Sequence, residues 1–273
     1  MKDVIFRGLC ETDIPSLKNF APAEWNFDLE EFLLRVNCKP VFEAIVAEKD
    51  NGIITGFGHL LQSGSNCWLG NIIVSPESQG MGYGTALTQI LIDKCRKSGA
   101  RTISLIATAQ GEKIYSRLGF VTECFYHCYT PPAGNPDHEI TDGTIRILDS
   151  GSFGQVCDLD RIATGEDRSM LLADHIKSGY ASFDGNVMLG FFLPSWDNGP
   201  VISSQHDTGL ALLDFKMRYF NLPLVLPETN YRTIDYLEKR GFTLKWRLPR
   251  MVMGSTHNWN PEMIFSRAAG YCG

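Results

Sequence analysis

Three glycines at alternate positions, Gly80, Gly82 and Gly84, stand in the stretch "VSPESQGMGYGTALTQIL", between an apolar run and a helical pattern. Successive backbone N–H groups at a helix N-terminus form a partly positive concavity suited to phosphate, and glycine lets such a ligand approach without a Cβ in the way. The order Gln-x-x-Gly-x-Gly differs from the dinucleotide fingerprint, and the turn lacks the Lys-Ser/Thr end of a nucleotide-hydrolase loop. We therefore expect this turn to bind a phosphate group in another kind of ligand site.

The elements that must position this turn are readable on both sides of it. The runs "PVFEAIVAEKD" and "GIITGFGHLLQ" flank Asn51-Gly52, a strong hairpin signal, and "CWLGNIIV" follows as a third strand. Helical spacing of apolar residues predicts a helix over 85–97. A further strand, "RTISLIAT", and a short helix in "GEKIYSRLGF" complete a mixed α/β unit with antiparallel strands before the turn.

The same outline returns in the second part of the chain. After "YTPPAGNPDHEITDG", where periodicity is lost, "GYASFDGNVMLGFFLP" repeats a strand-turn-strand, and "YLEKRGF" ends a helix as "IYSRLGF" did. We predict a duplicated fold, each copy a mostly antiparallel twisted sheet flanked by helices. The expected parts are a catalytic domain over 1–130, a linker over 131–143 and a second domain over 144–273.

Composition narrows the classes of function. The 273 residues are 44% hydrophobic and 21% charged, which is typical of a globular protein, and the net charge of −6 disfavours nucleic acid as a partner. No apolar run is long enough to cross a bilayer and the N-terminus lacks the apolar core of a signal peptide, so we expect a cytoplasmic protein with no membrane partner. The eight cysteines have no Cys-x-x-Cys or zinc spacing, which predicts reduced thiols and no metal.

The turn Gln79-Gly80-Met81-Gly82-Tyr83-Gly84, with "VSPE" before it and "IYSRLGF" after it, resembles the GNAT superfamily of acyl-CoA-dependent N-acetyltransferases. The resemblance covers roughly residues 3–130 and implies acetyl-CoA as cosubstrate. In that family the turn wraps the coenzyme pyrophosphate and the preceding strand binds the pantetheine arm through its backbone. The residues so implied to bind the coenzyme are Ile73, Val74, Gln79, Gly80, Met81, Gly82, Tyr83, Gly84, Thr85, which opens the helix, and Thr108. The whole chain is similar to two-domain (tandem) GNAT proteins with a degenerate second GNAT domain.

The resemblance also implies a general acid. Tyr115, four residues before Gly-Phe, matches the family's tyrosine that protonates the departing thiolate, and the Val74 N–H is the natural donor to the oxyanion. The general base stays open, because Ile106 stands where relatives often carry an acid; water relay is one alternative. The ionisable candidates near the site are Glu24, Asp28, Glu43 and His59.

Trp25 and Glu24 lie in the segment that lines the acceptor pocket of GNAT enzymes, where they could hold a cation. An amphipathic helix start that buries Trp25 is the alternative. With Asp28, Glu30 and Glu31, this stretch is acidic.

The second copy lacks the matching groups. Leu237 stands where Tyr115 does, and Asn230 stands where Thr108 does. Of the three glycines, only one has a counterpart in the second copy, Gly209. We expect this part to hold no coenzyme, to brace the first domain and to wall its acceptor pocket. The segment "LDRIATGEDRS" either reaches over that pocket or forms a solvated face with local ion pairs; its charged residues include Asp160, Arg161, Asp167 and Arg168.

The leading hypothesis is an acetyl-CoA-dependent N-acetyltransferase that acts on a primary amine of a small or medium, cationic acceptor, a small molecule or a peptide. An inactive acyl-CoA-binding sensor or scaffold is the rival from another class, and a nucleotide-binding oxidoreductase is a more distant one. The sequence leaves open which amine is acetylated and whether the protein is a monomer or a homodimer.

Overall fold

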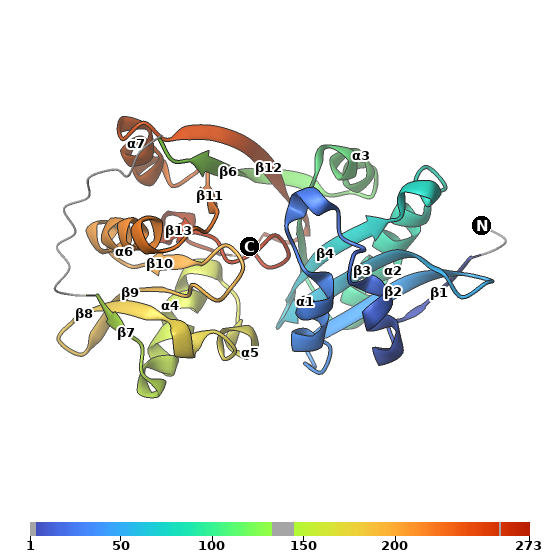
Figure 1. Ribbon diagram of the computed structural model, residues 1–273, viewed down its shortest axis with the longest axis horizontal. Coiled ribbons are helices and arrows are strands. Elements are labelled where there is room, and N and C mark those ends of the chain that lie inside the picture. Colours follow the sequence, from blue (N-terminus) through green and yellow to red (C-terminus); the bar gives the residue numbers. More distant parts are fainter. Residues whose placement is uncertain (1–3, 133–144, 257) are drawn as a thin grey trace.

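The computed structural model describes residues 4–132, 145–256 and 258–273. Most of the expected linker, residues 133–143, lies outside the described residues. We call residues 4–130 the first half and residues 145–273 the second half; Figure 1 shows them side by side, with strands β6 and β12 running across both.

The first half confirms the sequence of strands and helices expected from the chain, with small shifts at their ends. The helix after the glycine turn begins at Tyr83, two residues before the predicted Thr85. Its strands and helices are β1 (Val4–Gly8), η1 (Glu11–Leu17), η2 (Ala23–Trp25), α1 (Leu29–Val36), β2 (Phe42–Lys49), β3 (Ile54–Ser63), β4 (Asn66–Val74), η3 (Pro76–Ser78), α2 (Tyr83–Lys97), β5 (Thr102–Ile106), α3 (Ala109–Arg117) and β6 (Val121–Thr130).

The second half repeats the order strand, helix, three strands, helix, strand, helix, strand, which supports the predicted duplication. Helix α5 and strand β13 are additions to that order. Its elements are β7 (Ile145–Ile147), η4 (Ser150–Ser152), α4 (Phe153–Thr164), α5 (Ser169–Leu172), η5 (Ile176–Ser178), β8 (Tyr180–Asp184), β9 (Val187–Phe192), β10 (Val201–Ser203), α6 (His206–Tyr219), β11 (Leu224–Pro227), α7 (Tyr231–Lys239), β12 (Thr243–Gly254), η6 (Pro261–Met263) and β13 (Ile264–Ser266).

The two sheets do not divide at the expected domain boundary. The larger sheet has the order β1-β2-β3-β4-β5-β12-β6-β11, and the smaller has the order β13-β10-β9-β8-β7. Strand β12 of the second half therefore lies between β5 and β6, antiparallel to both. Because strands of both halves share one sheet, the limits 1–130 and 144–273 stay a prediction for where each domain would end.

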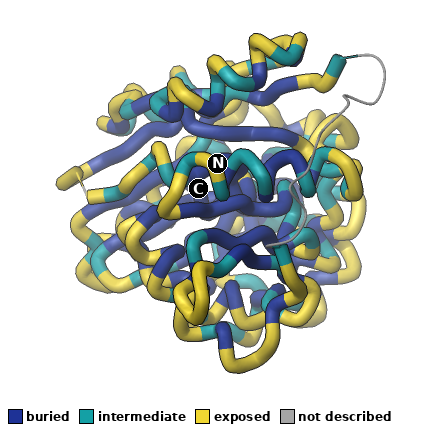
Figure 2. The backbone as a smooth tube through the Cα atoms, turned by 90° about the vertical axis from the view of Figure 1, so that its left-hand side faces the viewer, coloured by how far each residue is buried: buried dark blue, intermediate teal, exposed yellow. Residues whose placement is uncertain are grey.

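The core lies on both faces of the larger sheet. Helices α2 and α3 pack on one face, around Leu87, Leu91 and Phe120. Helix α1 packs on the other face in a cluster that continues into the second half through residues such as Val156 and Phe191. Figure 2 shows the buried strands in the middle of the molecule, with exposed residues on the outer helices and turns.

Candidate functional site

The glycine turn forms a helix mouth with free backbone donors. Gly80 and Gly82 have φ values of 79° and 85°, in the left-handed region that favours glycine, and Gly82 caps α2 without any side chain. The first hydrogen bond of the helix runs from Ala86 N to Gly82 O, at 3.0 Å. The amides of residues 83–85 thus point out of the helix end, where the helix dipole favours an anion.

The space in front of this mouth is open. A Cβ placed on Gly80 or Gly82 would meet no other atom within 4 Å, and Met81 is exposed. The Tyr83 side chain points the other way, because its ring is buried and packs edge-on against Phe6 at 6.3 Å. Tyr83 can therefore contribute its backbone amide to a ligand, but not its ring.

Buried hydroxyl groups hold the turn in place. The Thr55 hydroxyl lies 2.7 Å from Ser75 Oγ and also bonds Ser78 Oγ. The Gln79 side chain donates from Nε2 to the Val74 carbonyl at 3.2 Å, so it fixes the end of β4. Sequence reasoning missed Thr55, Ser75 and Ser78; the two serines in "VSPES", just before the glycines, were the available signal.

Strands β4 and β5 diverge beside the turn. They pair in parallel at residues 66–68 of β4 with residues 102–104 of β5, and no pair beyond these is formed in the described chain. The register of β4 against β3 shifts between Gly70 and Ile73, and Asn71 there has a φ of 49°. No strand of the described chain pairs with the edge of β4 that faces β5 beyond residue 68, so an extended ligand with amides can pair with its backbone.

Tyr115 lies on α3, on the same face as α2. The Thr108 hydroxyl caps α3 by accepting from Gly111 N at 3.2 Å. One turn later the Tyr115 ring packs over Gly111, where a Cβ would come within 2.7 Å of it, and against Phe120. Burial raises the pKa of Tyr115 to about 12, so the phenol is protonated at neutral pH.

Tyr115 and the end of β4 lie against one apolar cluster. Tyr115 and Val74 both pack against the apolar cluster formed by α2, β4 and β5. A neutral phenol, an open edge of β4 and the helix mouth thus border the same side of the sheet. This arrangement can hold a phosphate-bearing ligand with an extended amide arm and supply a proton near the far end of that arm.

The candidates for a general base are placed less favourably. Asp28 caps α1 by accepting from Glu31 N at 2.9 Å, and Glu43 pairs with Lys94 at 2.7 Å. His59 is fully buried among aromatic rings that include Phe32 and Phe42, and burial lowers its pKa to about 3. His59 is therefore neutral and a very weak base at physiological pH.

The predicted acceptor residues lie at the surface. Glu24 and Trp25 form η2, and Trp25 is 38% exposed. The alternative of a helix start that buries Trp25 is therefore not what the structure has. No polar contact joins either residue to Tyr115 in the described chain.

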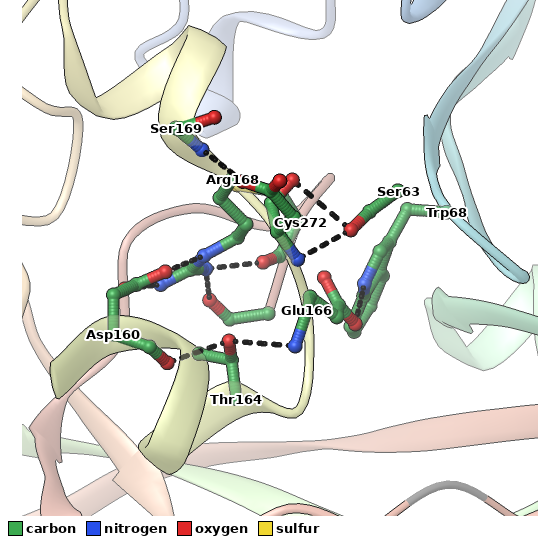
Figure 3. Close-up of polar contacts among 10 residues, drawn as sticks. Ser63, Trp68, Asp160, Thr164, Glu166, Arg168, Ser169 and Cys272 are labelled. Atoms are coloured by element: carbon green, nitrogen blue, oxygen red, sulfur yellow. Dashed lines mark hydrogen bonds and ion pairs between the residues drawn. The ribbon is translucent and has the colours of Figure 1, made fainter. Parts of the chain in front are cut away.

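The second half contributes a buried segment against β4. Trp68 Nε1 donates to the buried Glu166 carboxylate at 2.7 Å, and Ser63 Oγ accepts from Asp167 N at 2.7 Å (Figure 3). Arg168 forms a buried double hydrogen bond with Asp160 and donates to Cys272 O. The segment 159–169 is thus an interface between the halves. Of the four charged residues predicted for this segment, Arg161 is the one that forms an exposed ion pair, with Asp158.

The second half has filled the gap that corresponds to the space between β4 and β5. Strand β13 pairs with β10, and Arg267 N, just after it, donates to Val225 O of β11 at 2.8 Å. Phe265 packs against Gly209 near the start of α6, where a Cβ would lie 2.1 Å from the ring. A ligand arm has no open strand edge to pair with there.

Comparison with known proteins identifies what this fold is similar to. Residues 40–122 match the family model described as an acetyltransferase (GNAT) domain. The chain is similar to a protein from Pyrococcus horikoshii that is described as an acetyltransferase from its assignment. The two structures superpose with a TM-score of 0.84 at 19% identity, and the match covers 100% of this chain and 97% of the other. Residues 40–122 thus match a GNAT acetyltransferase domain, and the whole chain shares the fold of that solved structure.

Curated relatives match over shorter stretches. An uncharacterized N-acetyltransferase, ycf52, from Pyropia yezoensis is 25% identical over 97 residues, which cover 35% of this chain and 56% of the relative. A mycothiol acetyltransferase from Cellulomonas flavigena is 36% identical over 85 residues, which cover 29% of this chain and 23% of the relative. The chain thus spans about half of the first relative and under a quarter of the second. Of the described residues, no helix is both long and apolar enough to cross a membrane.

Proposed function

We propose that this protein is an acetyl-CoA-dependent N-acetyltransferase that acts on the primary amine of a small acceptor. The observation that carries the proposal is the left-handed turn at Gly80 and Gly82, which opens α2 beside the diverging strands β4 and β5. The outward amides of residues 83–85 suit the coenzyme pyrophosphate. The edge of β4 that ends at Val74 suits the amides of the pantetheine arm.

The reaction needs one nucleophile, one oxyanion donor and one acid. The free amine attacks the thioester carbonyl, the new C–N bond forms, and the C–S bond breaks with its electron pair on sulfur. The Val74 N–H stabilises the oxyanion, and the Tyr115 phenol protonates the departing thiolate, then regains a proton from water. The nitrogen loses its remaining extra proton to solvent. Burial raises the pKa of Tyr115 to about 12, so the phenol carries its proton at every physiological pH.

The expectation of a cationic acceptor rests on fewer groups than the sequence suggested. Asp28 caps α1, and Glu30 lies 3.4 Å from Lys18. Glu24 and Glu31 remain as exposed carboxylates that would attract the ammonium form of the acceptor's amine.

The test is release of free thiol from acetyl-CoA in the presence of an amine panel, with the acetylated product identified by mass spectrometry. Tyr115→Phe should lower kcat by about 10²-fold or more, the usual range for loss of a general acid, with acetyl-CoA affinity retained. Tyr129→Phe is the matched control, because the pKa of Tyr129 is also raised to about 12 but its ring packs among residues of the second half. Coenzyme binding without thiol release for any amine would favour an inactive acyl-CoA sensor instead.

A further inference from the structure

Arg267 is a buried cation that forms no ion pair within 4 Å in the described chain. Its side chain follows β13, is 6% exposed, and its Nε and Nη1 atoms have no hydrogen-bond partner among the described residues. The guanidinium lies 4.9 Å from the centre of the Tyr126 ring. Asp197, whose charge acts on it, instead lies 3.8 Å from Arg35. A buried charge is costly unless it is paired, so the site is suited to an anion from outside the chain.

Tyr126 adds an unused donor to the same place. Its side chain is fully buried on β6, and its hydroxyl has no hydrogen-bond partner in the described chain. The charges of Arg250 and Arg267 both act on this hydroxyl. A phenol beside two guanidinium groups can donate a hydrogen bond to a carboxylate or phosphate oxygen.

The other two buried arginines of this region have carboxylates of their own. Arg250 lies 2.6 Å from Glu123 and between the rings of Trp68 and Trp259, at 4.7 and 4.2 Å. Arg168 is held by Asp160, as described above. The positive charge of Arg267 is the one left unmatched among these three buried arginines.

Tyr126, over whose ring Arg267 lies, is next to the gap between β4 and β5. Tyr126 lines a cavity between the halves together with Trp68, Trp259 and Arg250. Tyr126 also packs against Ile106, the last residue of β5. Ile106 follows the residues at which β5 pairs with β4, so it lies where the two strands have separated. A molecule held at Tyr126 and Arg267 would therefore lie beside the open gap, on the face opposite to α2 and α3.

We infer that Arg267 and Tyr126 bind an anionic group, a carboxylate or a phosphate, of the amine that accepts the acetyl group. This inference rests on the proposed function and specifies its substrate class: an amino acid or aminoalkyl phosphate, in which one end is bound by Arg267 and the amine at the other end meets the thioester. Both halves of the chain are then needed to recognise the acceptor.

The test compares matched acceptors by thiol release. Each pair keeps the amine and removes the charge of the anionic group: an amino acid and its amide, and an aminoalkyl phosphate and the corresponding amino alcohol. Wild-type protein should show a higher kcat/KM for the acidic member of at least one pair, and the pair that responds tells carboxylate from phosphate. Equal rates within both pairs would overturn the inference and leave the acetyltransferase proposal standing.

Variants assign the preference to the two residues. Arg267→Met should reduce the acidic acceptor's kcat/KM by at least about 30-fold, the lower end for loss of one partner of a buried charge pair, with the neutral acceptor little changed. Tyr126→Phe should act in the same direction and removes a hydroxyl that bonds nothing in the described chain. Arg247→Met is the matched control, since Arg247 also stacks on a ring, that of Phe125 at 4.6 Å, but is exposed. A preference that survives both Arg267→Met and Tyr126→Phe would contradict the inference.

A binding measurement separates this inference from the proposed function. Succinate or inorganic phosphate should raise the Tm of wild-type protein, and Arg267→Met should lose that rise, whether or not any amine is acetylated. Without anion, Arg267→Met should have a Tm equal to or above that of wild type, because it removes a buried unpaired charge. A Tm that responds equally to these anions in wild type and in Arg267→Met would overturn the site even if acetyl transfer is confirmed.

Discussion

The indole N–H of Trp68 on β4 donates to the buried carboxylate of Glu166, from the second half, at 2.7 Å. Burial raises the pKa of Glu166, so this carboxyl group is expensive to bury without a hydrogen bond. The contact joins the strand that would line the coenzyme to the segment that links α4 and α5. The second half is thereby joined to β4 of the first half.

Glu166→Leu should lower the free energy of unfolding by about 1–3 kcal/mol, because it leaves the buried Trp68 N–H without an acceptor. Glu166→Gln keeps an oxygen at the same place and should cost much less. Urea denaturation of both variants measures the difference. Equal losses for the two would mean that the indole hydrogen bond contributes nothing.

The fragment 1–130 should not fold by itself. It lacks β12, so β5 and β6 would lose the strand that lies between them and would expose apolar and unpaired edges. We expect aggregates on size-exclusion chromatography, and recovery of soluble protein when residues 131–273 are co-expressed. A soluble fragment with the full rate of thiol release would refute the structural role of the second half.

Gly82→Ala should weaken acetyl-CoA binding by at least about tenfold, or ~1.4 kcal/mol, because it strains the left-handed helix mouth and places a methyl group where the pyrophosphate approaches. Gly185→Ala is the matched control: Gly185 also has a positive φ, 57°, with open surroundings, but lies in the turn between β8 and β9. Gly209→Ala is a poor control, since its Cβ would collide with Phe265. Calorimetric titration measures both affinities, and equal weakening would show that the strain alone is responsible.

The pH profile of kcat/KM should rise with pH and stay high through pH 10. The rise reflects loss of the acceptor's ammonium proton, and kcat/KM reports pKa values of the free reactants. An ordinary tyrosine would titrate near pH 10, but the pKa of Tyr115 is raised to about 12. The fall of kcat/KM that its ionisation would cause is therefore expected near pH 12. A falling limb centred near pH 10 that disappears in Tyr115→Phe would contradict the raised pKa.

Much of the first half could be predicted because its signals are local. The Asn51-Gly52 hairpin, the strand before the glycines and the helix of Tyr115 each depend on neighbours in the chain. The start of α2 was misplaced by two residues because a left-handed glycine, Gly82, caps it in place of a polar side chain. The insertion of β12 between β5 and β6 could not be predicted, because strands so far apart in the sequence pair without leaving any local pattern.

The site was predictable to the same extent. The glycine turn is a local pattern and Tyr115 is implied by the resemblance to the GNAT superfamily, whereas the second-half groups depend on packing. The segment 159–169 reads as a charged face, yet its Asp160 and Arg168 are both buried, because each neutralises the other. Arg267 and Tyr126 carry no motif at all; their exceptional feature is burial without a partner, which only the folded chain reveals.

The central claim is that the chain has one acetyl-CoA site, in the first half, and that β13 fills the corresponding gap of the second half. Isothermal titration of the full chain with acetyl-CoA tests it most directly. The account predicts one mole of coenzyme bound per mole of chain, with binding weakened by Gly82→Ala. A stoichiometry of two, or a single site unaffected by Gly82→Ala, would contradict it.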